Sequence, residues 1–162
     1  MLGKLNDEQV EELLKTNLVG RIGCHADDIT YVVPVHYVYE TPYIYVHSAD
    51  GLKISLMRKN PAVCFEIDEI RDFFNWQSVI CWGVFEEITG MQEQRQAMQK
   101  IIDRIEPYLG HNEDAHPSHG IADLASELGT TKDLVIYRIR FHQKTGKFEH
   151  RALSPLPGQE ES

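Results

Sequence analysis

The fold of this chain is decided by the stretch Tyr43–Asp68, which reads YIYVHSADGLKISLMRKNPAVCFEID. A strand-like run ends at His47, and a turn of small and polar residues that contains Gly51 follows. A short helix then begins near Lys53 and ends at Asn60-Pro61, because proline cannot continue a helix. A second strand starts directly after the proline. The stretch therefore predicts a strand, a polar turn, one short helix and another strand.

The start of this short helix has the features of an anion-binding site. Backbone N–H groups at a helix N-terminus point outward, and the helix dipole favours a negative ligand there. Gly51 allows such a ligand to come close to the backbone. Three cations, Lys53, Arg58 and Lys59, lie within seven residues of a chain whose formal net charge is −9. A solvated turn with a charged helix face explains the same residues, and the spacing is not that of a Walker loop, so both interpretations stay open at this point.

The composition bounds the classes of protein to which the chain can belong. With 42% hydrophobic and 25% charged residues it is typical of a globular domain. We expect a single domain over residues 1–154 and a disordered tail over residues 155–162. The acidic balance argues against a nucleic-acid partner. No apolar run approaches a membrane span, and the N-terminus does not read as a signal peptide, so we expect a cytoplasmic protein with no membrane partner.

Hydrophobic patterns predict six strands and few helices. The expected helices cover residues 6–15, where Asn6 and Gln9 have the spacing of a capping box, and residues 91–105. The expected strands cover residues 19–25, 29–39, 43–47, 62–70, 77–88 and 134–141, and residues 143–147 are expected to form a turn. Strands joined mostly by hairpins indicate a mainly β fold, a closed six-stranded antiparallel barrel.

Two residues inside the expected strands predict irregularities. Pro34 cannot donate a hydrogen bond to a neighbouring strand, so it marks an edge, a bulge or a place where something other than a strand lies alongside. Gly83, in the middle of its strand, indicates a bulge or a tight bend of the barrel.

Histidines and cysteines suggest little chemistry of their own. Three histidines lie close together in one polar loop: His111, His116 and His119. Their spacing matches no metal-binding motif, so we expect no metal. Three cysteines lie far apart in strand-like runs: Cys24, Cys64 and Cys81. We expect buried free thiols. Cys24 and His25 do not form a nucleophile pair, because adjacent residues of a strand point to opposite faces.

Several segments together resemble the FMN-binding split-barrel superfamily of pyridoxamine 5′-phosphate oxidase-like proteins, in particular its nitroimidazole-resistance-type branch. The matching segments are VGRI (19–22), VPVHYVY (33–39), IYVHSA (44–49), GLK (51–53), NPAVCFEI (60–67), SVICWG (78–83) and KTGK (144–147). They occur in the family's order. The resemblance implies a six-stranded antiparallel split β-barrel with a few flanking helices. It also implies a homodimer that holds FMN, or alternatively FAD, at the subunit interface.

The resemblance also implies roles for individual residues. Val33, Pro34 and Val35 would flank the flavin ring. His47, Ser48 and Lys53 would hold the phosphate and the ribityl chain. The segment with Trp76, Ser78 and Val79 would approach from the fifth strand, often that of the partner subunit. Leu52 stands where the branch often has arginine, so Arg21, Arg58 and Lys59 are the candidates for the missing phosphate contact.

By this resemblance the function is that of a flavin-dependent oxidoreductase acting on a small molecule, with NAD(P)H as a candidate electron donor. The redox chemistry would belong to the flavin, and the protein would orient the ring and tune it. The sequence shows no acid–base pair for a particular substrate. Two alternatives remain: a flavin carrier or sensor without turnover, and a haem-binding split-barrel protein.

Overall fold

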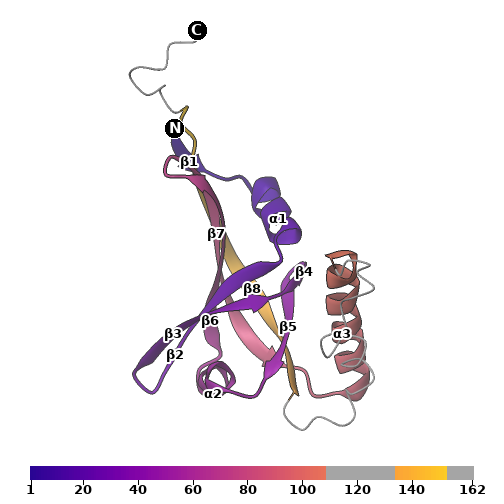
Figure 1. The fold of residues 1–162 in the computed structure, drawn as a ribbon. Coiled ribbons are helices and arrows are strands. Elements are labelled where there is room, and N and C mark those ends of the chain that lie inside the picture. Colours follow the sequence, from indigo (N-terminus) through magenta and orange to yellow (C-terminus); the bar gives the residue numbers. More distant parts are fainter. Residues whose placement is uncertain (109–133, 153–162) are drawn as a thin grey trace, which may run out of the picture.

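The computed structural model of this chain describes residues 1–108 and 134–152. These residues form one antiparallel sheet with helices around it (Figure 1). The elements are β1 (Leu2–Lys4), α1 (Asp7–Thr16), β2 (Val19–Ala26), β3 (Ile29–His36), β4 (Val38–Glu40), β5 (Tyr43–Ala49), α2 (Leu52–Lys59), β6 (Ala62–Asp72), β7 (Asn75–Glu87), α3 (Met91–Ile105), the 3-10 helix η1 (Glu106–Tyr108) and β8 (Leu134–Glu149). No helix within the described ranges is long and apolar enough to cross a membrane.

The strands are ordered β3-β2-β6-β7-β8-β5-β4, and β1 pairs with β8. A mainly β antiparallel fold is therefore confirmed, but the sheet formed by the described residues has eight strands where six were expected. One addition is β1. The other arises because the expected strand over residues 29–39 is interrupted at Tyr37. The Tyr37 backbone N–H donates to the Leu18 carbonyl at 3.1 Å, and its hydroxyl donates to the Leu14 carbonyl at 2.8 Å, which separates β3 from β4.

The main core lies inside the curved sheet. Its fully buried side chains come from most strands and from the first two helices, and they include Leu14, Ile22, Ile44, Ile54, Met57, Phe65, Ile67, Val79, Tyr137 and Ile139. A second, smaller cluster lies where α3 packs against β5 and β8; it is built from Tyr45, Ile88, Ala97, Met98, Ile101 and Ile136. In Figure 1, α3 accordingly stands beside β5 and outside the main core.

The capping and helix-ending residues in the sequence predicted the limits of the helices correctly. At α1, the Gln9 backbone N–H donates to Asn6 Oδ1 at 2.8 Å and the Asn6 N–H donates to Gln9 Oε1 at 2.9 Å, so the predicted capping box is present. Helix α2 begins after Gly51 and ends before Asn60. Helix α3 has the predicted limits, Met91 and Ile105.

Helix α1 is fastened to the sheet by a polar network around Glu11. Its carboxylate accepts hydrogen bonds from the Tyr39 hydroxyl at 3.0 Å and the Thr41 hydroxyl at 2.9 Å, and it forms an ion pair with Lys144. Burial of the Glu11 carboxyl raises its pKa, but the hydrogen bonds from Lys144, Tyr39 and Thr41 outweigh this effect and leave the pKa below its ordinary value.

The last strand, β8, corrects the prediction. It was expected to end at Phe141 and to be followed by a turn over residues 143–147, but it runs without interruption from Leu134 to Glu149. Trp82 of β7 faces Gln143 and Gly83 faces Phe141, so His142 has no partner in the ladder and forms a bulge. The irregularity predicted at Gly83 is therefore confirmed.

The bulge explains why the sequence pattern predicts a strand that ends too early, at Phe141. Before it, the positions of β8 that face the main core are odd-numbered, from Val135 to Phe141, and after it the inward side holds even-numbered positions such as Lys144 and Gly146. The alternation therefore breaks at His142, which resembles the end of a strand. Gly146 lies within this strand and not in a turn. The position requires glycine, because a Cβ there would lie 2.8 Å from the Leu5 side chain.

The remaining predictions about the chain have mixed outcomes. Pro34 lies on β3, at one end of the strand order, so its interpretation as an edge residue is confirmed. The three cysteines are free, as expected; Cys24 and Cys81 are buried, whereas Cys64 is half-buried. The histidine loop and the tail at residues 155–162 lie outside the described residues.

Candidate functional site

The sheet is open between β3 and β5. Strand β4 pairs with β5 as far as Val38 opposite Tyr45, and the same register would place His36 opposite His47. Instead β3 pairs with β2 and turns away from β5. Figure 1 shows the two strands diverging, with α2 near the end of β5. We call this opening the seam; it is bordered by residues 33–36 of β3, residues 47–49 of β5 and the start of α2.

One cation at the seam has no charged partner among the described residues. Arg58 forms a two-point ion pair with Glu87, at 2.7 and 2.9 Å, and a further one with Asp50 at 3.2 Å. Lys59 is paired with Asp27. Lys53 is half-buried in the first turn of α2 and forms no ion pair with any residue of the described ranges. Lys53 is therefore the cation of α2 that is available to a ligand.

His47 and Ser48 lie on β5, just before the turn that leads to α2. Burial lowers the pKa of His47, and the positive charges of His36 and Lys53 lower it further. At neutral pH the His47 imidazole is consequently uncharged, with one nitrogen that donates a hydrogen bond and one that accepts. The Ser48 hydroxyl is half-buried and donates to the Ala49 carbonyl at 3.0 Å.

The predicted ring-flanking segment lies on the opposite border of the seam. Val35 is buried in the core, Val33 is half-buried against it, and Pro34 is exposed. Because these residues belong to a strand that pairs on only one side among the described elements, their other edge is free to lie against a ligand. Their contact with a flavin ring stays a prediction.

Arg21 and Arg58, two candidates for the missing phosphate contact, form ion pairs within the chain. Arg21 lies on the outer face of β2 and contacts Glu66 at 3.1 Å and Asp68 at 3.0 Å. The hydrogen bond to Glu66 and the charge of Asp68 raise the pKa of Arg21. Arg58 lies on the same helix as Lys53, five positions further along the chain. The sequence did not indicate these carboxylate partners, because the pairing of Arg21 with Glu66 depends on the register of β2 against β6.

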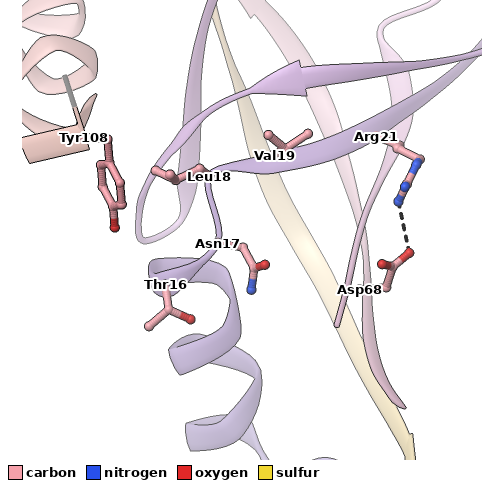
Figure 2. Close-up of a pocket in the computed structure, with 7 residues that line it drawn as sticks. All are labelled: Thr16, Asn17, Leu18, Val19, Arg21, Asp68 and Tyr108. Carbon is pink, nitrogen blue, oxygen red and sulfur yellow. Dashed lines mark hydrogen bonds and ion pairs between the residues drawn. The ribbon is translucent and has the colours of Figure 1, made fainter. Parts of the chain in front are cut away.

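Arg21 also borders a cavity of about 470 Å³, which we call the Arg21 cavity (Figure 2). Its lining residues are Thr16, Asn17, Leu18, Val19, Arg21, Asp68 and Tyr108. No residue of this cavity other than Arg21 was singled out in the sequence, because the lining comes from segments that are far apart in the chain.

Trp76, Ser78 and Val79 lie far from Lys53 in the same chain. Val46 of β5 and Glu87 of β7 both lie opposite Tyr137 of β8, which places Glu87 at the level of the seam. Eleven residues separate Glu87 from Trp76, or roughly 35 Å along the strand at about 3.3 Å per residue. Figure 1 shows the start of β7 beside β1, at the opposite end of the sheet from α2. Within one chain, these three residues and Lys53 cannot hold the same ligand.

At that distant end the side chains have contacts of their own. The Trp76 indole N–H donates to Glu149 Oε2 at 3.2 Å, Ser78 is half-buried and Val79 is fully buried. Trp76 and Glu149 also border a second cavity, of about 660 Å³, with Arg71, Gln77 and Arg151 among its other lining residues.

Comparison with known proteins identifies relatives over most of the chain. Residues 6–147 match the family described as pyridoxamine 5′-phosphate oxidase. A curated protein of Rhizobium meliloti (strain 1021), itself described as uncharacterized, is 31% identical over 88 residues. Those residues are 54% of this chain and 58% of that protein, so the match spans less than two thirds of the relative.

Solved structures share the fold. A FAD-binding protein from Mesorhizobium loti is 26% identical, with a TM-score of 0.71, and the match covers 93% of this chain and 99% of that one. A candidate 5-nitroimidazole antibiotic resistance protein from Bacteroides thetaiotaomicron is 19% identical, with a TM-score of 0.66 and coverage of 91% and 87%. The FAD-binding protein of Mycobacterium smegmatis is 20% identical, with a TM-score of 0.56 and coverage of 93% and 100%. The last two likenesses bear on the fold alone.

Proposed function

This chain belongs to the pyridoxamine 5′-phosphate oxidase family, and we propose that it is a flavin-binding oxidoreductase of that family. The observation that carries the proposal is Lys53, a half-buried cation without an ion pair in the described residues, at the N-terminus of α2 and beside the open seam. A phosphate is the anion that a helix N-terminus with a lysine binds well. The FAD-binding relative from Mesorhizobium loti, matched along its whole length, supports the same ligand class.

The residues at the seam fit the parts of FMN, which we propose as the cofactor, with FAD as the alternative. Lys53 and the free N–H groups of α2 hold the phosphate, whose charge the helix dipole also favours. His47 and Ser48 offer hydrogen bonds to the ribityl hydroxyls, and the uncharged His47 imidazole can both donate and accept. The free edge of β3 at Pro34 lies along the ring. When bound, the flavin supplies the transfer of electrons; these residues bind and orient it.

We further propose a homodimer with the flavin at the subunit interface. Val32 of β3 and Ile80 and Trp82 of β7 share the outer face of the sheet, and their side chains are 63%, 39% and 36% exposed. A partner would cover this apolar surface; obligate homodimers bury above about 2,000 Å². A second copy is also the way to bring Trp76, Ser78 and Val79 to the seam. Sedimentation that shows only monomer at micromolar concentration would contradict the dimer.

The visible spectrum and the mass of the ligand that copurifies test the proposed cofactor. We expect flavin absorption bands and the mass of FMN. A haem Soret band, or a protein that neither carries nor takes up a flavin, would refute the proposal in favour of the alternatives. Oxidation of NAD(P)H with a nitroaromatic acceptor then tests turnover; a flavoprotein that reduces no acceptor with any donor is a carrier or a sensor.

A further inference from the structure

We propose that Arg58 is a positioning residue for the phosphate site. It holds the Asp50 carboxylate away from the N-terminus of α2 and so keeps that end of the helix open for the phosphate of the ligand. That the ligand carries a phosphate rests on the proposed function, whereas the contacts of Arg58 with Asp50 exist without any ligand.

Asp50 is the carboxylate closest in sequence to the N-terminus of α2. It directly precedes Gly51, the N-cap residue, and the first turn of the helix contains no acidic residue. No side-chain cap is formed at this end among the described residues, so the first N–H groups are open to an acceptor. A carboxylate is favoured there for the same reasons as a phosphate, namely the N–H groups and the helix dipole. Asp50 is therefore a competitor for the phosphate that the chain itself supplies.

Arg58 links Asp50 to the end of strand β7. Its Nε and Nη2 donate to the two carboxylate oxygens of Glu87, at 2.9 and 2.7 Å. Its Nη1 donates to both oxygens of Asp50, at 3.3 and 3.2 Å. Glu87 lies opposite Tyr137 in the ladder of β7 and β8, so the sheet fixes its place. The guanidinium thus ties the turn before α2 to the sheet through a planar set of donors, which a lysine does not have.

The contact draws the Asp50 carboxylate along the side of the helix and not onto its end. Arg58 lies in the last turn of α2, six residues after Leu52, or roughly 9 Å along the axis at about 1.5 Å per residue. Side chains of a helix lean toward its N-terminus, so the Arg58 side chain reaches back to Asp50 from the C-terminal side. Both oxygens of Asp50 are then engaged by the guanidinium.

The charges near the seam make this contact important for an anion. Arg58, Asp50 and Glu87 together carry one negative charge, and without Arg58 they would carry two. The hydrogen bond from Arg58 lowers the pKa of Glu87, so this carboxylate is ionised at neutral pH and keeps the guanidinium in place. A phosphate with up to two negative charges is repelled by a free carboxylate a few Å away, enough to change its affinity by about tenfold even in water.

A double-mutant cycle on flavin-free protein, with FMN and riboflavin as probes, tests the role of Arg58. We expect Arg58→Ala to weaken FMN binding about tenfold, and to weaken riboflavin, which lacks the phosphate, by less than about twofold. Arg58→Ala combined with Asp50→Asn should bind FMN within about twofold of Asp50→Asn alone, because the competing carboxylate is gone. Lys59→Ala is the matched control: it removes the neighbouring cation, which is paired with Asp27, and should leave both affinities unchanged.

Two results of the cycle would overturn the proposal. Equal weakening of FMN by Arg58→Ala with and without Asp50→Asn would show that Arg58 contacts the phosphate directly and does not act through Asp50. An FMN affinity of Arg58→Ala within about twofold of the wild type, or a loss of riboflavin as large as that of FMN, would show that Asp50 does not compete for the phosphate.

Amide hydrogen exchange tests the same contact without any flavin. In Arg58→Ala the released Asp50 carboxylate should accept hydrogen bonds from the first turn of α2 and slow exchange there about threefold or more, and Asp50→Asn should reverse this effect. A turn that is merely loosened would exchange faster in both variants, which would overturn the proposal. A wild type that binds FMN no more tightly than riboflavin would contradict the proposed phosphate site, while the exchange rates still decide whether Arg58 keeps Asp50 away from α2.

Discussion

Replacing Lys53 by alanine isolates the phosphate contact at the seam. Lys53 forms no ion pair in the described residues, so its removal leaves no carboxylate unpaired, and we expect the free energy of unfolding to change by no more than about 0.5 kcal/mol. Toward FMN the effect is larger. A charge-assisted hydrogen bond to a phosphate contributes about 1.5–3 kcal/mol. Since each 1.4 kcal/mol is about tenfold in affinity, Lys53→Ala should weaken FMN binding about ten- to a hundredfold.

The assay is a titration of apo-protein with FMN and with riboflavin, which lacks the phosphate. Riboflavin should bind Lys53→Ala and the wild type almost equally, because the ring and the ribityl contacts are retained. Lys59→Ala is the matched control: it removes the same side chain from the same helix, but Lys59 is already paired with Asp27. If Lys53→Ala binds FMN within about twofold of the wild type, the phosphate lies elsewhere and the reasoning about the seam is wrong.

Three further changes test the fold. Gly146→Val should lower the stability by about 1–3 kcal/mol, measured by urea unfolding, because its Cβ would lie 2.8 Å from the Leu5 side chain; an unchanged midpoint would mean that α1 and its leading segment do not pack on β8. The Tyr137 hydroxyl is buried without a hydrogen-bond partner among the described residues, so Tyr137→Phe should leave the melting temperature unchanged or raise it. The control Tyr37→Phe should lower it, since that hydroxyl donates to the Leu14 carbonyl. The stability advantage of the wild type over Glu11→Gln should be complete above pH of about 4.5 and should disappear as the pH falls through the lowered pKa of Glu11; an advantage that is the same at every pH between neutral and strongly acidic would contradict this role.

Local patterns in the sequence were sufficient for much of the fold. The limits of α3 follow from an apolar face with helical periodicity, and the start of α1 follows from the spacing of Asn6 and Gln9. Pro34 and Gly83 marked the sheet edge and the bulge because each lacks a group that a regular central strand needs. These features depend on residues that are close together in the chain.

What local patterns could not indicate depends on residues that are far apart in the chain. The pairing of Arg21 with Glu66 and Asp68, and of Arg58 with Glu87, depends on how strands and loops pair across 29 to 47 positions. The separation of Trp76 from Lys53 depends on the strand order, since β7 carries Trp76 to the end of the sheet away from α2. The resemblance implied that the segment with Trp76 often comes from the partner subunit, and the arrangement of the strands shows why a single chain cannot bring Trp76 to Lys53.

The bulge at His142 has a consequence for how this chain can change in length. Exchanging the exposed His142 for another residue alters little, because it contributes neither to the core nor to the ladder. Deleting it would join Phe141 directly to Gln143, which already face the consecutive residues Gly83 and Trp82 of β7, so the ladder would become regular and Lys144 and Gly146 would stay inward. His142 is therefore the position at which β8 can lose one residue without a change of register, whereas a loss elsewhere in the strand would turn the residues beyond it to the other face. A gain of one residue in β8 becomes tolerable only together with a loss of another nearby.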